Sequence, residues 1–242
     1  MQAYPLVRPE EETLKRVLAG ASLARYGDGE FKHCANQRNV SQVHDPRLSE
    51  RLRGILRDSG SCMVGIPNLN PDALLRMTDE KRLWWKKLRH VAPLLAAERS
   101  YGSAFITRPD SAPWINTPTY WAAIETLWAG RDVTLVCGRD RDDGSTKTLT
   151  AADLASARTV REVLAPRQHA FAEYDELLER IGRPDRALLC LGPTATVLAV
   201  DLCARGVHAI DLGHIALFLR KYRRGEPLTL SKDDKSHDKV TA

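Results

Sequence analysis

The most informative stretch of the sequence is Ser22-Leu23-Ala24-Arg25-Tyr26-Gly27-Asp28-Gly29-Glu30-Phe31, in which a short apolar segment runs directly into a glycine turn that carries two carboxylates. In an extended loop, carboxylates at positions i and i+2 point the same way, and glycines let the backbone approach a ligand closely. Such oxygen ligands suit Mg²⁺ or Mn²⁺, so Asp28 and Glu30 are candidate metal ligands. Arg25 would clamp a metal-bound phosphate or pair with a carboxylate. A turn that caps a helix uses the same residue types and stays open as an alternative.

The rest of the chain alternates apolar runs of strand length with helical patterns, which is typical of a mostly parallel α/β sheet. Strands are predicted at residues 22–26, 61–66, 101–107, 132–137, 159–163, 186–191 and 207–211. Helices are predicted at 9–20, 45–60, 79–98, 117–129, 170–181 and 194–205. We expect a single doubly wound α/β domain over residues 1–224 and a polar, disordered C-terminal tail over 225–242.

The composition, 43% hydrophobic and 28% charged, is that of an ordinary globular protein. No apolar run is long enough to cross a membrane, and the polar, acidic N-terminus does not fit a signal peptide. The five cysteines form no CxxC pair, which is typical of free thiols in a reducing compartment. These features predict a cytoplasmic location.

One basic segment, Arg220-Lys221-Tyr222-Arg223-Arg224, stands out within a modest net charge of +5. Such a segment is typical of a solvated helix end, or of a surface attracted to a phosphorylated substrate or to anionic lipid. Peripheral association with the inner face of the membrane is therefore an open expectation. Nucleic acid is not an expected partner, because no zinc-finger, RRM or helix-turn-helix signature accompanies the charge. The sequence carries no signal for the oligomeric state.

Two further loops follow predicted strands, at the sheet edge where doubly wound proteins bind ligands. In the first, Gly192-Pro193-Thr194 opens a helix, whose unpaired amides and threonine hydroxyl suit a diphosphate. In the second, Asp211 ends a strand and His214 follows a glycine, so that either could complete a metal site. Helix capping and ordinary hydrogen bonding remain the alternatives for these residues.

A competing site lies in the loop after the predicted strand 132–137. Asp140 and Asp142 form the Asp-x-Asp pattern with which many nucleotide-sugar transferases bind metal. Arginines next to these aspartates would neutralise them, and a mixed-charge surface loop is the alternative interpretation.

Four segments, taken in order, resemble the GT-D-type glycosyltransferase family, formerly a domain of unknown function found in bacterial glycan-building loci. The resemblance runs from about Ser22 to His214. Its matching pieces are Arg25-Tyr26-Gly27-Asp28-Gly29-Glu30; Ala165-Pro166 with Ala170-Phe171 and Tyr174-Asp175-Glu176; Leu191-Gly192-Pro193-Thr194-Ala195 with Val197-Leu198-Ala199 and Asp201-Leu202; and Ala209-Ile210-Asp211-Leu212-Gly213-His214.

The resemblance implies a Rossmann-like fold and the transfer of a sugar from a nucleotide donor, a UDP-sugar, to a bacterial glycan or lipid-linked acceptor. It implies that Asp28-Gly29-Glu30 is the family's Asp-x-Glu motif for Mn²⁺ or Mg²⁺, with His214 as a further candidate ligand. Arg25 and Gly27 would face the donor diphosphate, and Gly192-Pro193-Thr194 would lie beside the nucleotide. Asp211 and His214 are the candidate bases that would deprotonate the acceptor.

The chain departs from the family pattern after His214. An aspartate and an acidic-aromatic pair are expected there, and Ile215-Ala216-Leu217-Phe218-Leu219 is found instead. Either acceptor handling differs, or the chain is a catalytically silent module that binds a nucleotide or a partner. An NAD(P)-dependent oxidoreductase has no support, because the glycine fingerprint of a dinucleotide site is absent.

Overall fold

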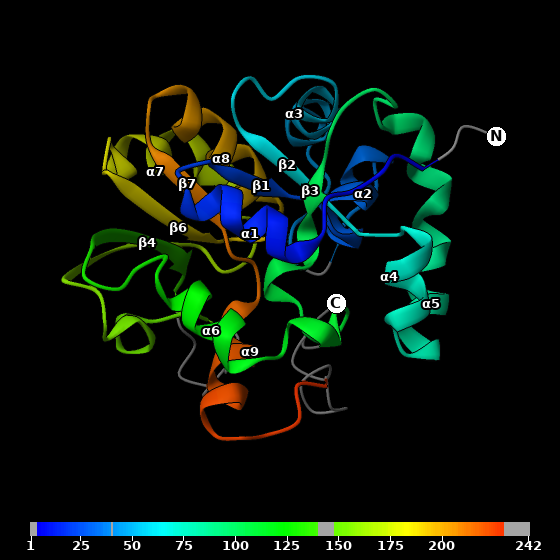
Figure 1. Ribbon diagram of the computed structural model, residues 1–242. Coiled ribbons are helices and arrows are strands. Elements are labelled where there is room, and N and C mark those ends of the chain that lie inside the picture. The colour runs from blue at the N-terminus through cyan, green and yellow to red at the C-terminus, as the bar shows by residue number, and fades with distance from the viewer. Residues whose placement is uncertain (1–3, 40, 140–147, 230–242) are drawn as a thin grey trace.

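The computed structural model describes residues 4–39, 41–139 and 148–229, which form one seven-stranded sheet (Figure 1). Its order is β3-β2-β1-β7-β6-β4-β5, and all paired strands are parallel. The predicted α/β fold with a mostly parallel sheet is confirmed. The strands are β1 (Leu23–Arg25), β2 (Met63–Ile66), β3 (Gly102–Ser103), β4 (Asp132–Gly138), β5 (Thr159–Ala165), β6 (Arg186–Cys190) and β7 (His208–Asp211).

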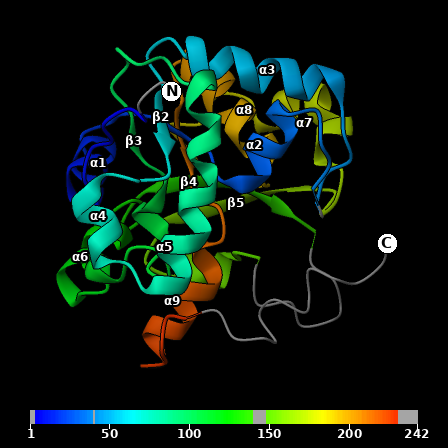
Figure 2. The same ribbon diagram turned by 90° about the vertical axis from the view of Figure 1, so that its right-hand side faces the viewer.

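Helices lie on both sides of the sheet, as a doubly wound topology requires (Figure 2). On one side, α8 packs against the central strands and is flanked by α2, α3 and α7. On the other side lie α1, α6 and α9, where Trp121 of α6 stacks on Tyr222 of α9 with ring centroids 5.0 Å apart. The helices are α1 (Glu10–Leu18), α2 (Asp28–Cys34), α3 (Pro46–Arg57), α4 (Pro71–Arg76), α5 (Asp79–Lys86), α6 (Pro118–Glu125), α7 (Tyr174–Ile181), α8 (Pro193–Ala204) and α9 (Ile215–Arg223).

The strand order creates a topological switch between β1 and β7. The chain builds β1, β2 and β3 outward to one edge and then crosses to the other half of the sheet, from which β7 returns beside β1. Loops that leave the carboxyl ends of β1 and β7 therefore border the switch point, which is where open α/β sheets bind their ligands.

Two predicted elements are shorter than expected. The strand predicted at 101–107 is reduced to β3, because the hydroxyl of Ser103 accepts a hydrogen bond from the amide of Phe105 and the chain turns into the 3-10 helix η2 (Ala104–Thr107). The long helix predicted at 79–98 ends as α5 and continues as the 3-10 helix η1 (Lys87–Leu94), which contains Pro93 and its missing amide.

The sequence pattern also missed α4. Within the segment predicted as a tail, Leu228 is buried against the core, and residues 230–242 lie outside the described part of the chain. In that described part, no helix combines the length and the apolar character needed to span a membrane.

Leu188, fully buried at the centre of β6, tests how much of the stability depends on the sheet core. We expect Leu188→Ala to lower the free energy of unfolding by about 2–5 kcal/mol, because the lost apolar contacts leave a cavity. The matched control is Leu75→Ala, whose side chain is 73% exposed and whose loss should change stability by less than about 0.5 kcal/mol. Urea unfolding measures both variants, and equal losses would contradict this account of the core.

Candidate functional site

The candidate residues of three predicted loops gather at the carboxyl ends of three adjacent strands. Asp28 and Glu30 follow β1, Asp211 and His214 end or follow β7, and Gly192 follows β6. Because the order is β1-β7-β6, these loops are neighbours at one edge of the sheet. Asp140 and Asp142, the competing pair, lie outside the described residues.

Asp28 and Glu30 lie in the first turn of α2, and the prediction of an extended loop with two parallel carboxylates was wrong. The helix-capping alternative is the correct one: Gly27 is the N-cap, and its amide donates to Oε2 of Glu30 at 2.7 Å. Side chains two positions apart in a helix point in roughly opposite directions, about 200° apart. Asp28 therefore faces solvent, 44% exposed and 3.2 Å from Nζ of Lys32, while Glu30 is buried.

The buried carboxyl of Glu30 is held in an unfavourable environment for a negative charge. Burial raises its pKa to about 7, and repulsion from Asp211 and Asp28 adds to the rise, while the hydrogen bond from Gly27 opposes it. A carboxyl with such a pKa is poised to accept a cation, which would lower the pKa again.

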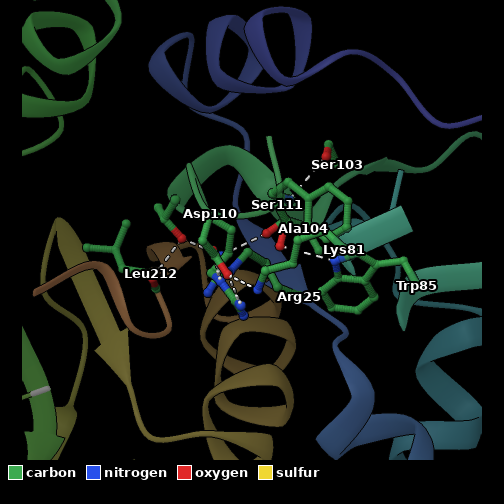
Figure 3. A network of polar contacts seen from close by, with 11 residues as sticks. Arg25, Lys81, Trp85, Ser103, Ala104, Asp110, Ser111 and Leu212 are labelled. Carbon is green, nitrogen blue, oxygen red and sulfur yellow. Dashed lines mark hydrogen bonds and ion pairs between the residues drawn. The ribbon is translucent and has the colours of Figure 1, made fainter. Parts of the chain in front are cut away.

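Arg25, at the end of β1, contacts residues of η2 and β7 at this edge of the sheet. Its Nη1 donates to the carbonyl of Ala104 at 2.9 Å and to the hydroxyl of Thr107, which itself donates to the carbonyl of Leu212 at 3.0 Å (Figure 3). Its Nη2 lies 3.6 Å from Oδ1 of Asp211. With only 8% of the residue exposed, Arg25 contacts the protein on three sides.

The side chain of Arg25 leaves no room for a side chain at position 213, which is a glycine. Its φ is +53°, and a Cβ at this position would lie 1.8 Å from Nη2 of Arg25. The same turn is closed by its amide, which donates to Oδ1 of Asp211 at 3.0 Å. Asp211 is buried, which raises its pKa, while Arg25 and the amide of Gly213 lower it.

A second cationic group, which the sequence pattern did not single out, lies next to this network. Arg108 forms two hydrogen bonds to Asp110, at 2.7 and 2.8 Å, and Lys81 of α5 reaches the same carboxylate at 2.5 Å (Figure 3). Burial lowers the pKa of Arg108, but the negative charge and hydrogen bonds of Asp110, together with the charges of Asp28 and Glu30, outweigh burial and raise that pKa. The sequence did indicate that Arg108 lies near the site, because Arg108 directly follows the predicted strand 101–107 and so belongs to the ligand-binding edge of the sheet.

The turn between β6 and α8 leads into a helix, as predicted, and its role as a diphosphate site stays a prediction. Gly192 is exposed at the N-cap of α8 with φ +54°, and Pro193 occupies the first helical position, where no amide is needed. The hydroxyl of Thr194 is buried and has no hydrogen-bond partner within the described structure. A ligand at this turn would therefore meet Gly192 before Thr194.

The described ranges contain no group of three or more His, Cys, Asp or Glu side chains that could hold a metal ion. His214 is exposed at the N-cap of α9. The metal set of Asp28, Glu30 and His214 stays a prediction. Any ion bound at α2 would take part of its coordination from a diphosphate or water, as Mg²⁺ commonly does.

Comparisons with known proteins agree with this geometry. The model of the family described as "Glycosyltransferase GT-D fold" matches residues 23–237. A solved structure described as "The highly conserved domain of unknown function 1792 has a distinct glycosyltransferase fold" is similar with a TM-score of 0.81 and 28% identity, over 94% of this chain and 84% of that one. Another, "A New Glycosyltransferase (DUF1792) from Streptococcus sanguinis", gives a TM-score of 0.79 and 28% identity over 92% and 86% of the two chains.

Two curated relatives are also similar. A "Probable glycosyl transferase Gly" from Streptococcus gordonii is 31% identical over 81% of this chain, and "Glycosyltransferase GlyD" from Streptococcus pneumoniae serotype 4 is 29% identical over 86%. The matched regions span only 30% and 26% of those relatives, so both are much longer than the region they share with this chain.

Glu30→Gln separates the charge of Glu30 from its capping role, because the amide oxygen can still accept from Gly27. The folded protein keeps the Glu30 proton up to about pH 7, whereas an unfolded chain releases it near 4.5, so stability falls as pH rises through this window. We expect the variant to be more stable than the parent at pH 8, by up to about 3 kcal/mol, and equally stable at pH 4. Urea unfolding in chelator measures this, and parallel pH curves for both proteins would refute it.

Gly213→Ala tests the contact with Arg25, and Gly206→Ala is its control. Gly206 has φ +83°, and a Cβ added there would have nothing within 4 Å, so this variant should lose only the about 1–2 kcal/mol of a left-handed alanine. Gly213→Ala must also displace the guanidinium, and we expect a larger loss in urea unfolding. Equal losses would mean that Arg25 adjusts without cost.

Proposed function

The chain belongs to the glycosyltransferase GT-D fold family, and from this premise we propose that it transfers a sugar from a nucleotide-sugar donor, a UDP-sugar, to a glycan acceptor. The observation that supports the proposal most directly is the group of charged side chains at the switch point between β1 and β7. There the buried carboxyl of Glu30, whose pKa is raised, interacts electrostatically with Asp28 and Asp211, and Arg108 interacts with Asp28 and Glu30. Carboxylates for a cation and an arginine for a phosphate are the two groups that a metal–diphosphate complex needs.

Asp28 and Glu30 are the residues that would hold Mn²⁺ or Mg²⁺. The charges at this position fit a cation, because Asp28 and Asp211 both repel a negative charge on Glu30. Asp28 points away from Glu30 in α2 and would have to turn toward it to share one ion. Two protein carboxylates would leave coordination positions for diphosphate oxygens. When bound, the ion would offset the charge that develops on the leaving nucleoside diphosphate. Asp28 must give up its pair with Lys32, which is solvent-exposed and therefore contributes little stability.

Arg108 and Arg25 have different roles in this proposal. Arg25 is engaged by Ala104, Thr107 and Asp211, so it positions the loops after β1 and β7. The side chain of Arg108 is 24% exposed, and it is the cation that would approach the donor diphosphate from the η2 side. The backbone amides at the start of α8 would provide a second, uncharged binding site for the same diphosphate.

His214 is better placed than Asp211 to deprotonate the acceptor. Asp211 is buried and accepts hydrogen bonds from Gly213 and Arg25, so it orients Arg25. His214 is exposed at the N-cap of α9, directly after β7, so that an acceptor hydroxyl would have access to its side chain.

A lipid-linked acceptor is part of the proposal, but the arginines of the segment 220–224, which could attract an anionic lipid, lie next to carboxylates of the protein. Arg220 is paired with Asp153, Arg223 lies 3.8 Å from Glu125, and Arg224 is paired with Glu226. Attraction to anionic lipid at the inner membrane face would have to act against these pairs. The proposal therefore rests on a glycan acceptor, with or without a lipid.

A catalytically silent module is the second candidate function. The segment Ile215–Leu219, where the family pattern carries acidic residues, is buried along its whole length. It therefore presents no carboxylate to an acceptor. A silent module would bind a nucleotide and a metal without turning over any donor.

Asp28→Asn tests the proposed site. We expect the Kd of UDP in the presence of Mn²⁺ to rise at least tenfold, about 1.4 kcal/mol, because one of two metal ligands is lost. Asp79→Asn is the control: Asp79 also starts a helix, α5, and is also exposed and paired within its helix, with Arg82. Isothermal titration calorimetry should give Asp79→Asn the affinity of the parent.

Turnover of UDP-sugars by the parent separates the two candidate functions. Hydrolysis or transfer with Mn²⁺ supports the transferase, and binding without turnover of any donor supports the silent module. An unchanged affinity in Asp28→Asn would refute the site at α2 in both cases.

A further inference from the structure

A cavity lies at the opposite edge of the sheet from the candidate site. It has a volume of about 390 Å³ and is formed where β4, β5, β6 and β7 begin. The candidate site is at the carboxyl ends of the strands, so β6 and β7 run from one site to the other. The cavity is lined by Gly130, Arg131, Asp132, Arg158, Asp185, Arg186 and His208.

The three arginines of the cavity differ in their partners. Arg158 is paired with Asp132, with Nε 2.8 Å from Oδ1, and Thr159 donates to the same carboxylate. Arg186 donates to the carbonyl of Leu127 and has no carboxylate within ion-pair distance among the described residues. Arg131 is exposed and, in the same part of the chain, forms no side-chain ion pair either.

The unpaired cations repel one another across the cavity. Only 9% of Arg186 is exposed, and this burial, together with the charge of Arg131, lowers the pKa of Arg186 to about 10. His208 lies opposite Arg186 in the register of β6 and β7, and its Nε2 is 3.1 Å from the carbonyl of Ala21. Burial, Arg186 and Arg131 lower the pKa of His208 to about 4, so that His208 is neutral.

We propose that this cavity is a binding site for a phosphate-class oxyanion, held between the guanidinium groups of Arg131 and Arg186. Two planar guanidiniums present parallel N–H donors that match the oxygens of a tetrahedral oxyanion. A bound anion would replace the repulsion between the arginines by two attractions. Binding of an oxyanion in this cavity does not depend on the proposed glycosyl transfer, and the two proposals can be tested separately.

The charges of the lining limit the ligand to a small anion. Three arginines and two aspartates, Asp132 and Asp185, leave a net charge of only +1 beside a neutral His208. The aspartates would repel a polyanion such as a nucleic acid. Inorganic phosphate and the phosphoryl group of a small monoester share the required chemistry.

Phosphate binding to the full chain and to two charge-matched variants tests the proposal. Arg131→Ala removes an exposed side chain of the cavity, whereas Arg183→Ala removes an exposed arginine of the same region that does not line it. We expect saturable binding of inorganic phosphate to the parent, at least tenfold weaker binding to Arg131→Ala, and binding within twofold of the parent for Arg183→Ala. Calorimetry measures the affinities, and the rise in Tm with phosphate gives an independent readout.

Three outcomes would overturn the proposal: no saturable phosphate binding to the parent, equal weakening by both variants, or loss of phosphate binding when UDP and Mn²⁺ are added in excess. The last result would assign the anion to the carboxyl edge of the sheet. A parallel titration with glycerol 3-phosphate identifies the source of the oxyanion. Tighter binding of the monoester, sensitive to Arg131→Ala, supports a metabolite, and tighter binding of inorganic phosphate supports the free ion.

Discussion

The buried guanidinium of Arg25 is the constraint on which the ligand-binding edge depends. A charge inside a protein is tolerated only when it is paired and hydrogen-bonded, and removal of one partner of such a pair typically costs about 3–5 kcal/mol. The partners of Arg25 come from η2 and β7, although Arg25 itself ends β1. One side chain thereby joins three segments that lie far apart in the sequence, at the switch point between β1 and β7.

The burial of Arg25 explains why the charged groups at this edge have different roles. Because Arg25 is engaged within the protein, a second arginine is needed to meet an anionic ligand, and Arg108 arrives from the same η2 segment that Arg25 anchors. Asp110 holds Arg108 and Lys81 together, and the positive charge of Arg108 interacts with Glu30. The carboxyl with the raised pKa and the accessible cation thus depend on one scaffold.

The strands and the location of the site could be predicted from the sequence, whereas the geometry at Asp28 and Glu30 could not. Apolar runs bounded by glycine and polar residues specify strands through local propensity and burial, which is why all seven were found. The same Gly27-Asp28-Gly29-Glu30 pattern suits a loop or a helix start, and the choice depends on where Glu30 is buried. The charged groups that interact with the buried Glu30 come from distant parts of the chain, Asp211 from β7 and Arg108 from the end of η2, and the local pattern gives no sign of them.

The two central strands β6 and β7 separate the charged groups of the two edges of the sheet. Between their ends, Ala187, Leu188 and Leu189 on β6 and Ala209 and Ile210 on β7 are fully buried and apolar. The charged side chains therefore pair within their own edge: Asp28 with Lys32 and Asp211 with Arg25 at the carboxyl edge, and Asp132 with Arg158 at the other. Among the described residues, Glu30 at the first edge and Arg186 at the second are left without an ion pair. Any counter-charge for these two groups must come from solvent or from a ligand, a cation for Glu30 and an anion for Arg186.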